Sequence, residues 1–152
     1  MEKESSKTII HHNLTNENGS NPDSNESEFQ FTQDLSLESI RKLHNKFVTE
    51  RNWEQYHSPR NIMMAMVGEI GEIAELFQWR NDSDCQVGLH SWTDEQRNAL
   101  GEELSDVLIY LTRLADRCHI DLPKAVLDKM KKNEEKYPID KVFGSSKKYN
   151  MY

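Results

Sequence analysis

Residues 67–76 read VGEIGEIAEL and residues 101–110 read GEELSDVLIY, and both stretches combine acidic with apolar side chains. In each stretch two carboxylates lie three positions apart: Glu69 and Glu72 in the first, Glu103 and Asp106 in the second. Residues with this spacing share one face of a helix, and here that face borders an apolar stripe, where an unpaired charge is costly. Two such helices packed together would converge four carboxylates. Oxygen ligands at that density suit a hard divalent cation, Mg2+ before Mn2+.

The same pattern argues against an iron site. Di-iron carboxylate bundles also use inward-facing glutamates, but they need a Glu-x-x-His motif on two of their helices. In this chain the fourth positions of the two motifs are Glu72 and Asp106, and neither motif contains a histidine. The motifs therefore favour magnesium.

Helical periodicity extends on both sides of the acidic stretches. Apolar residues recur at three- and four-residue steps from Leu37 to Arg51, which predicts a first helix. Ser58 followed by Pro59 is a typical helix start, and the second helix is expected to run from there to near Trp79. Residues 80–92 have no period and predict a loop.

Two further helices follow the loop. The segment 93–96 has the composition of a capping box and predicts the start of a third helix, which should end near Cys118. A fourth helix is expected from Asp121 to just before Pro138. Because no segment alternates at period two for long, the predicted fold is all-α, a four-helix bundle of antiparallel neighbours.

The 152 residues allow one domain. Residues 1–33 are rich in Ser, Asn and Glu, which is typical of a disordered tail, and residues 34–149 are expected to form the folded domain. A core of four helices is thin, and the second and third are apolar on more than one face. Self-association is therefore expected.

Charge and composition exclude several classes of partner. The formal net charge is -7 and no stripe of Lys or Arg exists, which argues against a nucleic-acid polymer as ligand. No apolar run approaches the roughly 20 residues of a membrane span. The chain begins without a signal pattern, and its two cysteines have no CxxC spacing, so we expect a cytosolic protein with free thiols.

Aromatic and histidine side chains lie close to the acidic motifs in sequence. Tyr110 lies one turn after Asp106, and Trp79 lies two turns after Glu72. Such side chains either belong to the core or form a slot in which a planar base stacks. His44, on the apolar side of the first helix, is either a core residue or a hydrogen-bonding group for a sugar or base.

The order Glu-x-x-Glu, spacer, Glu-x-x-Asp resembles the motif of the all-α nucleoside triphosphate pyrophosphatases, the MazG-like superfamily. Further segments resemble the branch of this family that acts on dCTP: RNWEQYHSPRN at 51–61, ELFQW at 75–79, EELSDVLIYL at 102–111, RCHIDLP at 117–123 and KYP at 136–138. The resemblance covers roughly residues 35–149. The tail and the 80–92 loop are this chain's own, and Tyr56 stands where the branch often has Phe.

The resemblance implies Mg2+-dependent hydrolysis of dCTP, including 5-modified forms, to dCMP and pyrophosphate, which removes unwanted nucleotides from the pool. It also implies a helical homotetramer. The catalytic residues and metal ligands would be Glu69, Glu72, Glu103 and Asp106. The substrate would be contacted by His44, Trp53, Glu54, Gln55, Tyr56, His57, Trp79 and Tyr110.

Other functions remain open from the sequence. The chain could hydrolyse another nucleotide such as dUTP, or a phosphoribosyl intermediate, with the same fold. It could also be a non-catalytic helical adaptor, in which case the acidic side chains would be paired with Lys or Arg instead of a metal.

Overall fold

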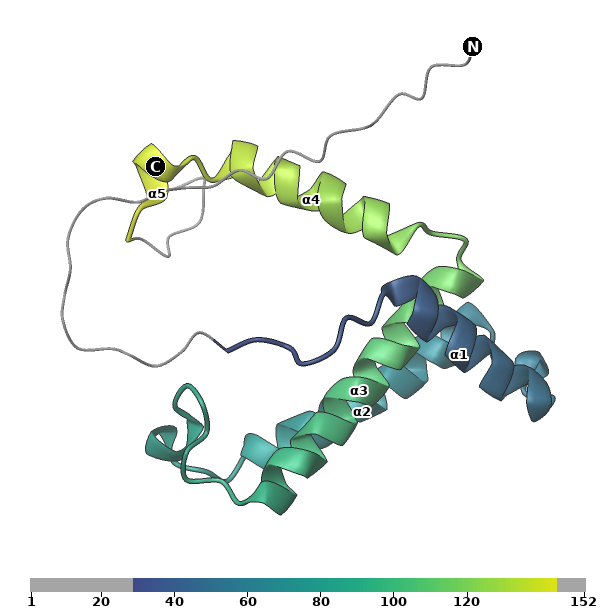
Figure 1. Cartoon of the computed structure of the whole chain (residues 1–152), viewed down its shortest axis with the longest axis horizontal. Helices are drawn as coiled ribbons and strands as arrows, with labels where there is room; N and C mark the ends of the chain where they lie inside the picture. Colours follow the sequence, from purple (N-terminus) through teal and green to yellow (C-terminus); the bar gives the residue numbers. More distant parts are fainter. Residues whose placement is uncertain (1–28, 145–152) are drawn as a thin grey trace, which may run out of the picture. The chain divides into compact units, whose positions relative to one another are not determined.

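The computed structural model of the chain describes residues 29–144, and their regular structure is entirely helical (Figure 1). The prediction of an all-α fold is confirmed. The helices are α1 (Leu37–Glu50), α2 (Pro59–Phe77), α3 (Asp94–Arg117), α4 (Leu122–Lys136) and α5 (Ile139–Val142), with short 3-10 turns η1 (Glu54–Tyr56) and η2 (Asp82–Cys85). The predicted tail lies outside the described residues except for residues 29–33, as do residues 145–149 of the predicted domain.

The long helices begin where their capping residues stand. The side chain of Ser58 accepts a hydrogen bond from the backbone N–H of Asn61, with Pro59 in the first turn. Thr93 and Gln96 form a complete capping box, because each side chain accepts from the other residue's backbone N–H. At the start of α4 the side chain of Asp121 accepts a hydrogen bond from the backbone N–H of Lys124. Each cap satisfies N–H groups that have no partner inside the helix, so the starts of α2, α3 and α4 are readable from sequence.

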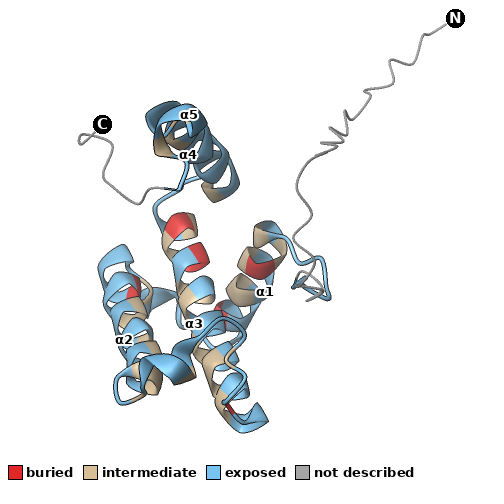
Figure 2. Cartoon of the chain, turned by 90° about the vertical axis from the view of Figure 1, so that its left-hand side faces the viewer, coloured by how far each residue is buried: buried red, intermediate tan, exposed pale blue. Residues whose placement is uncertain are grey.

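Three of the helices pack together. The most extensive contact is between α2 and α3, and α1 packs on α3. The buried apolar side chains are few: Ile40, Val48, Ile62, Trp92 and Ala115. Figure 2 shows the consequence, since most of the ribbon surface is exposed or intermediate.

The sequence predicts four packed helices, whereas only α1, α2 and α3 share extensive contacts in the described part of the single chain. Among the described residues, α4 shares no comparably extensive contact with α1, α2 or α3. Large apolar side chains on α2, α3 and α4 remain exposed, for example Val67, Leu104 and Leu127, which is 72% exposed. The turns η1 and η2 and the short α5 were not predicted, since each is too brief to show a period. Within residues 29–144, no helix has the length and apolar character needed to cross a membrane.

Candidate active site

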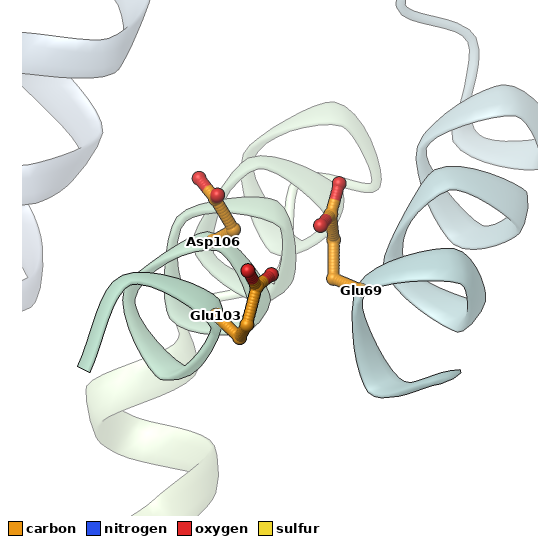
Figure 3. Close-up of side chains that lie close together, drawn as sticks. All are labelled: Glu69, Glu103 and Asp106. Carbon is orange, nitrogen blue, oxygen red and sulfur yellow. The ribbon is translucent and has the colours of Figure 1, made fainter. Parts of the chain in front are cut away.

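Three carboxylates from two helices meet at the contact between α2 and α3. Glu69 extends from α2, Glu103 and Asp106 extend from α3, and their carboxylates lie close together (Figure 3). One oxygen from each of the three lies within 4.8 Å of the others. Glu69 and Glu103 are half-buried and Asp106 is exposed. An ion placed among them would have three protein oxygens and open positions toward solvent, an arrangement that suits Mg2+ because it retains several waters.

Within residues 29–144, no Lys, Arg or His forms an ion pair with this carboxylate trio. Partial burial raises the pKa of Glu69 above its ordinary value, and the neighbouring charges of Glu72, Asp106 and Glu103 raise it further. Burial also raises the pKa of Glu103, with repulsion from Glu72, Asp106 and Glu102 in the same direction. The trio is therefore under electrostatic strain that a divalent cation would relieve.

Glu72 lies beside the trio and not within it. It is one turn further along α2, its side chain is exposed, and it is absent from the group of converging oxygens. Its charge still raises the pKa of both Glu69 and Glu103. Helical spacing correctly predicts that Glu69 and Glu72 share a face, but which of them reaches α3 depends on the register of the two helices.

A pocket of about 730 Å³ opens next to the trio, between α1 and α3. Asp106 forms part of its wall, so the pocket is continuous with the acidic site. Its aromatic and imidazole lining consists of His44, Phe47, Trp53, His57 and Tyr110. Four of the predicted substrate-binding residues therefore share one cavity: His44, Trp53, His57 and Tyr110.

Ring contacts order the pocket wall. The ring of His44 lies 5.9 Å from that of His57 and 6.5 Å, edge-on, from that of Tyr110, measured between centroids. Phe47 and Trp53 meet edge to face with centroids 5.8 Å apart. Asn52 adopts a left-handed backbone conformation at the end of α1, with φ of 54°, and this turn directs the chain into Trp53. The pocket is thus lined mainly by apolar and aromatic side chains with a few polar groups, the usual form of a small-molecule site.

Both histidines of the pocket are held toward the neutral form. Burial lowers the pKa of His44, and the charge of Arg113 and the neighbouring His57 lower it further, against the opposing carboxylates of Asp116 and Asp106. Burial also lowers the pKa of His57, followed by the charges of Arg113 and Arg117. A neutral imidazole has one donor and one acceptor nitrogen, so each ring can hydrogen-bond an uncharged base or sugar.

The other predicted substrate residues do not line this pocket. The carboxylate of Glu54 accepts a hydrogen bond from Thr49, and the amide of Gln55 donates to the carbonyl of Asn52, so both support the local turn. Tyr56 is 60% exposed and Trp79 is 88% exposed. Trp79 lies just beyond the end of α2, and its exposure excludes a core role within this chain.

The loop after Trp79 is more ordered than its sequence suggests. Trp92 is 2% exposed, its ring is 5.0 Å from that of Phe77, and its indole N–H donates to the carbonyl of Asp84. The guanidinium of Arg80 lies 3.9 Å from the centre of the Trp92 ring and donates to the carbonyl of Leu76. The sequence predicts a loop without period around Trp92 and gives no indication of this small core from its periodicity. The one local feature that indicates it is a tryptophan directly before a capping box.

Comparison with known proteins agrees with this geometry. The model of the MazG-like family matches residues 65–151, which include both acidic motifs. Two proteins named dCTP pyrophosphatase 1, from Rattus norvegicus and Homo sapiens, are each 54% identical over 121 residues, covering 80% of this chain and 70% of the relative. A crystal structure of a pyrophosphatase from Archaeoglobus fulgidus superposes with a TM-score of 0.60 at 34% identity, covering 72% of this chain and 99% of that one.

Proposed function

The chain belongs to the MazG-like family, and on this premise we propose that it hydrolyses dCTP to dCMP and pyrophosphate in a Mg2+-dependent reaction. The carboxylate trio of Glu69, Glu103 and Asp106 beside an aromatic pocket is the observation that carries the proposal. The relatives at 54% identity bear the name dCTP pyrophosphatase 1, which supports dCTP as the substrate.

The unpaired state of the acids favours an enzyme over an adaptor. A non-catalytic helical adaptor would be expected to neutralise inward carboxylates with Lys or Arg, because an uncompensated charge is costly. Instead, the pKa of Glu69 and of Glu103 is raised by burial and by neighbouring acids, and none of the ion pairs found in the described residues includes them. A bound cation would offset this repulsion, which supports the metal site that we propose.

The residues present fit a magnesium site. We propose that Glu69, Glu103 and Asp106 hold the ion, with Glu72 adjacent. Bound Mg2+ would stabilise charge developing on the phosphate oxygens and position a water for in-line attack. With the ion held by the trio, the phosphate end of the nucleotide would lie beside Asp106, and the base would enter the adjoining pocket. Cleavage next to the α-phosphorus, with pyrophosphate leaving, is inferred from the family.

The substrate contacts divide into two groups. His44, Trp53, His57 and Tyr110 already surround the pocket and would hold the base and sugar. Glu54, Gln55 and Tyr56 lie on the η1 turn next to Trp53, so they are placed to support that side of the pocket or to reach a longer ligand. A 5-modified cytosine would be accepted if the apolar wall near Phe47 receives the added group.

A nucleotide panel tests the reaction. Incubation of the full chain with Mg2+ and each of the canonical deoxynucleoside and ribonucleoside triphosphates should release pyrophosphate fastest from dCTP and 5-methyl-dCTP, with dCMP forms as products. Chromatographic identification of the monophosphate separates this cleavage from stepwise loss of single phosphates. Preference for dUTP would keep the reaction type and change the base, whereas no turnover with any nucleotide would return the chain to the adaptor hypothesis.

Trp79 provides a test of the substrate-binding proposal. Because its side chain is 88% exposed, Trp79→Ala should leave the melting temperature nearly unchanged. If Trp79 stacks on the base, as the resemblance to the dCTP branch implies, KM for dCTP should rise about tenfold, the size of one lost base-stacking contact. The Mg2+ concentration needed for half-maximal activity should stay the same. An unchanged KM across the nucleotide panel would exclude Trp79 from the site.

We also propose that the chain assembles into a homotetramer. Many large apolar side chains are left exposed on α2, α3 and α4, such as Val67, Leu104 and Leu127, and exposed apolar patches often mark surfaces that another chain covers. A second copy would cover them. Light scattering should give four times the chain mass, and a monomer mass would contradict the assembly. Location in the cytosol stays a prediction.

A further inference from the structure

A buried arginine connects α1 and α3 behind the pocket. Arg113 is only 2% exposed, and its Nη1 donates to the side-chain oxygen of Asn45 at 3.0 Å and to Asp116 Oδ2 at 2.9 Å. The other oxygen of Asp116 accepts from Arg41 on α1 at 3.0 Å. We call Asn45, Arg113, Asp116 and Arg41 the polar clamp. It joins the two helices that form the pocket through hydrogen bonds between residues far apart in sequence.

Burial of the Arg113 side chain carries a free-energy cost that the polar clamp only partly offsets. The Nε and Nη2 groups of Arg113 are buried and have no hydrogen-bond partner within the described part of the chain. Desolvation lowers the pKa of Arg113, against the opposing charge of Asp116. Buried ion pairs are often replaceable by apolar side chains without loss of stability, so a half-satisfied buried guanidinium is poorly explained by stability alone.

The clamp residues are neighbours of the pocket residues on both helices. Asn45 directly follows His44 on α1, and Arg113 lies three residues after Tyr110 on α3, one turn along the same face. The bond between Asn45 and Arg113 joins α1 to α3 next to the point where the rings of His44 and Tyr110 meet, with centroids 6.5 Å apart. The positive charge of Arg113 also acts on His44 and His57 in the same direction, toward the neutral ring.

We propose that Arg113 is a positioning residue for the nucleoside subsite, which acts by holding His44 in place through Asn45. This inference rests on the proposed function, since it gives His44 a role in binding the substrate. Arg113 itself does not line the pocket. Its contribution is to fix α1 against α3, so that the imidazole presents a defined edge to the sugar or base.

A double-mutant cycle tests the proposal. Steady-state kinetics with dCTP and saturating Mg2+ would be measured for Arg113→Met, His44→Ala and the double variant, each checked by circular dichroism and thermal melting. Arg113→Met keeps an unbranched side chain as far as the position of Nε and removes all of its donors. We expect KM to rise about tenfold, the size of a lost hydrogen bond to a charged group, with kcat within about twofold of the wild type because the carboxylate trio is untouched. In the His44→Ala background the same substitution should change KM by less than about twofold.

A milder variant protects the test against loss of folding. Asn45→Ala removes one bond of the clamp and leaves the Arg113–Asp116 pair intact, and it should raise KM in the same way and lose its effect when His44 is replaced. Equal effects of Arg113→Met or Asn45→Ala with and without His44 would overturn the proposal, as would a fall in kcat as large as the rise in KM. If His44→Ala binds dCTP normally, both this inference and the substrate role of His44 fail, while hydrolysis by the trio still stands. If His44→Ala raises KM and the clamp variants do not, this inference alone fails.

Discussion

Glu69→Gln and Asp106→Asn are expected to reduce kcat for dCTP by at least about a hundredfold, the largest change that any single substitution in this chain should produce. Each replaces a charged oxygen of the trio by a neutral amide of the same shape, so ligand geometry is kept and ligand charge is lost. Because neither residue belongs to the buried core, the helical content should stay at the wild-type level. A pyrophosphate-release assay measures kcat, and circular dichroism measures the helical content.

A matched control separates the loss of a ligand from the loss of a charge. Glu50 is an exposed acid near the end of α1, outside the carboxylate trio and the pocket. Glu50→Gln makes the same chemical change and should leave kcat unchanged. Full turnover in Glu69→Gln would remove the metal assignment, and an equal loss in the Glu50 control would point to a general effect of charge.

Much of this architecture is readable from local sequence, because helix starts depend on local chemistry. Ser58, Thr93 and Asp121 accept hydrogen bonds from the first turns of their own helices, and their positions were predicted correctly. Convergence of Glu69 with Glu103 and Asp106 follows from two amphipathic faces that must meet. The exclusion of Glu72 does not, since it depends on the register between α2 and α3, and a shift of one turn would exchange the two glutamates.

Residues whose role depends on distant partners were missed. Arg113 shares a helical face with Asp106 and Tyr110. Its acceptor Asn45 is 68 residues away in sequence, and no local sequence pattern predicts their hydrogen bond. Trp92 is buried only because Phe77 and Arg80 reach it across a loop. Apolar residues such as Leu104 match the helical period yet stay exposed in one chain. A hydrophobic pattern shows which side chains need covering and does not show whether the cover comes from the same molecule.

Withdrawal of divalent metal is expected to stop turnover completely. It should also change the sign of the effect of Glu69→Gln on stability, from destabilising with metal to stabilising without it. In the metal-free protein the raised pKa values of Glu69 and Glu103 mean that folding disfavours their charged forms. A carboxyl group with a raised pKa contributes stability below its unfolded pKa, and this contribution is lost as pH rises through its folded pKa. At neutral pH, metal-free Glu69→Gln should therefore melt at a higher temperature than the metal-free wild type, because the amide removes one of the repelling charges.

The difference in melting temperature between metal-free Glu69→Gln and the metal-free wild type should depend on pH in a defined direction. It should be largest at pH 7 and above, and should shrink as pH falls toward the raised pKa, where the wild-type carboxyl takes up a proton. The comparison should stay above about pH 4.5, because other acids affect stability below it. The ion pair with Arg41 holds the pKa of Glu38 at about 2, so the stabilising contribution of Glu38 is lost as pH falls from about 4.5 toward that value.

Addition of Mg2+ should reverse the order of the two melting temperatures at pH 7. A ligand that binds only the folded state stabilises it by about 2.7 kcal/mol at one hundred times its Kd. In the proposed site the wild type would hold the ion with three carboxylates, and the variant would hold it with two. Thermal melts of both proteins with EDTA and with Mg2+, at several pH values, give the four curves needed. If Glu69→Gln melts below the wild type without metal, or gains as much from Mg2+ as the wild type does, then the acids are compensated within the protein and the site does not hold the ion.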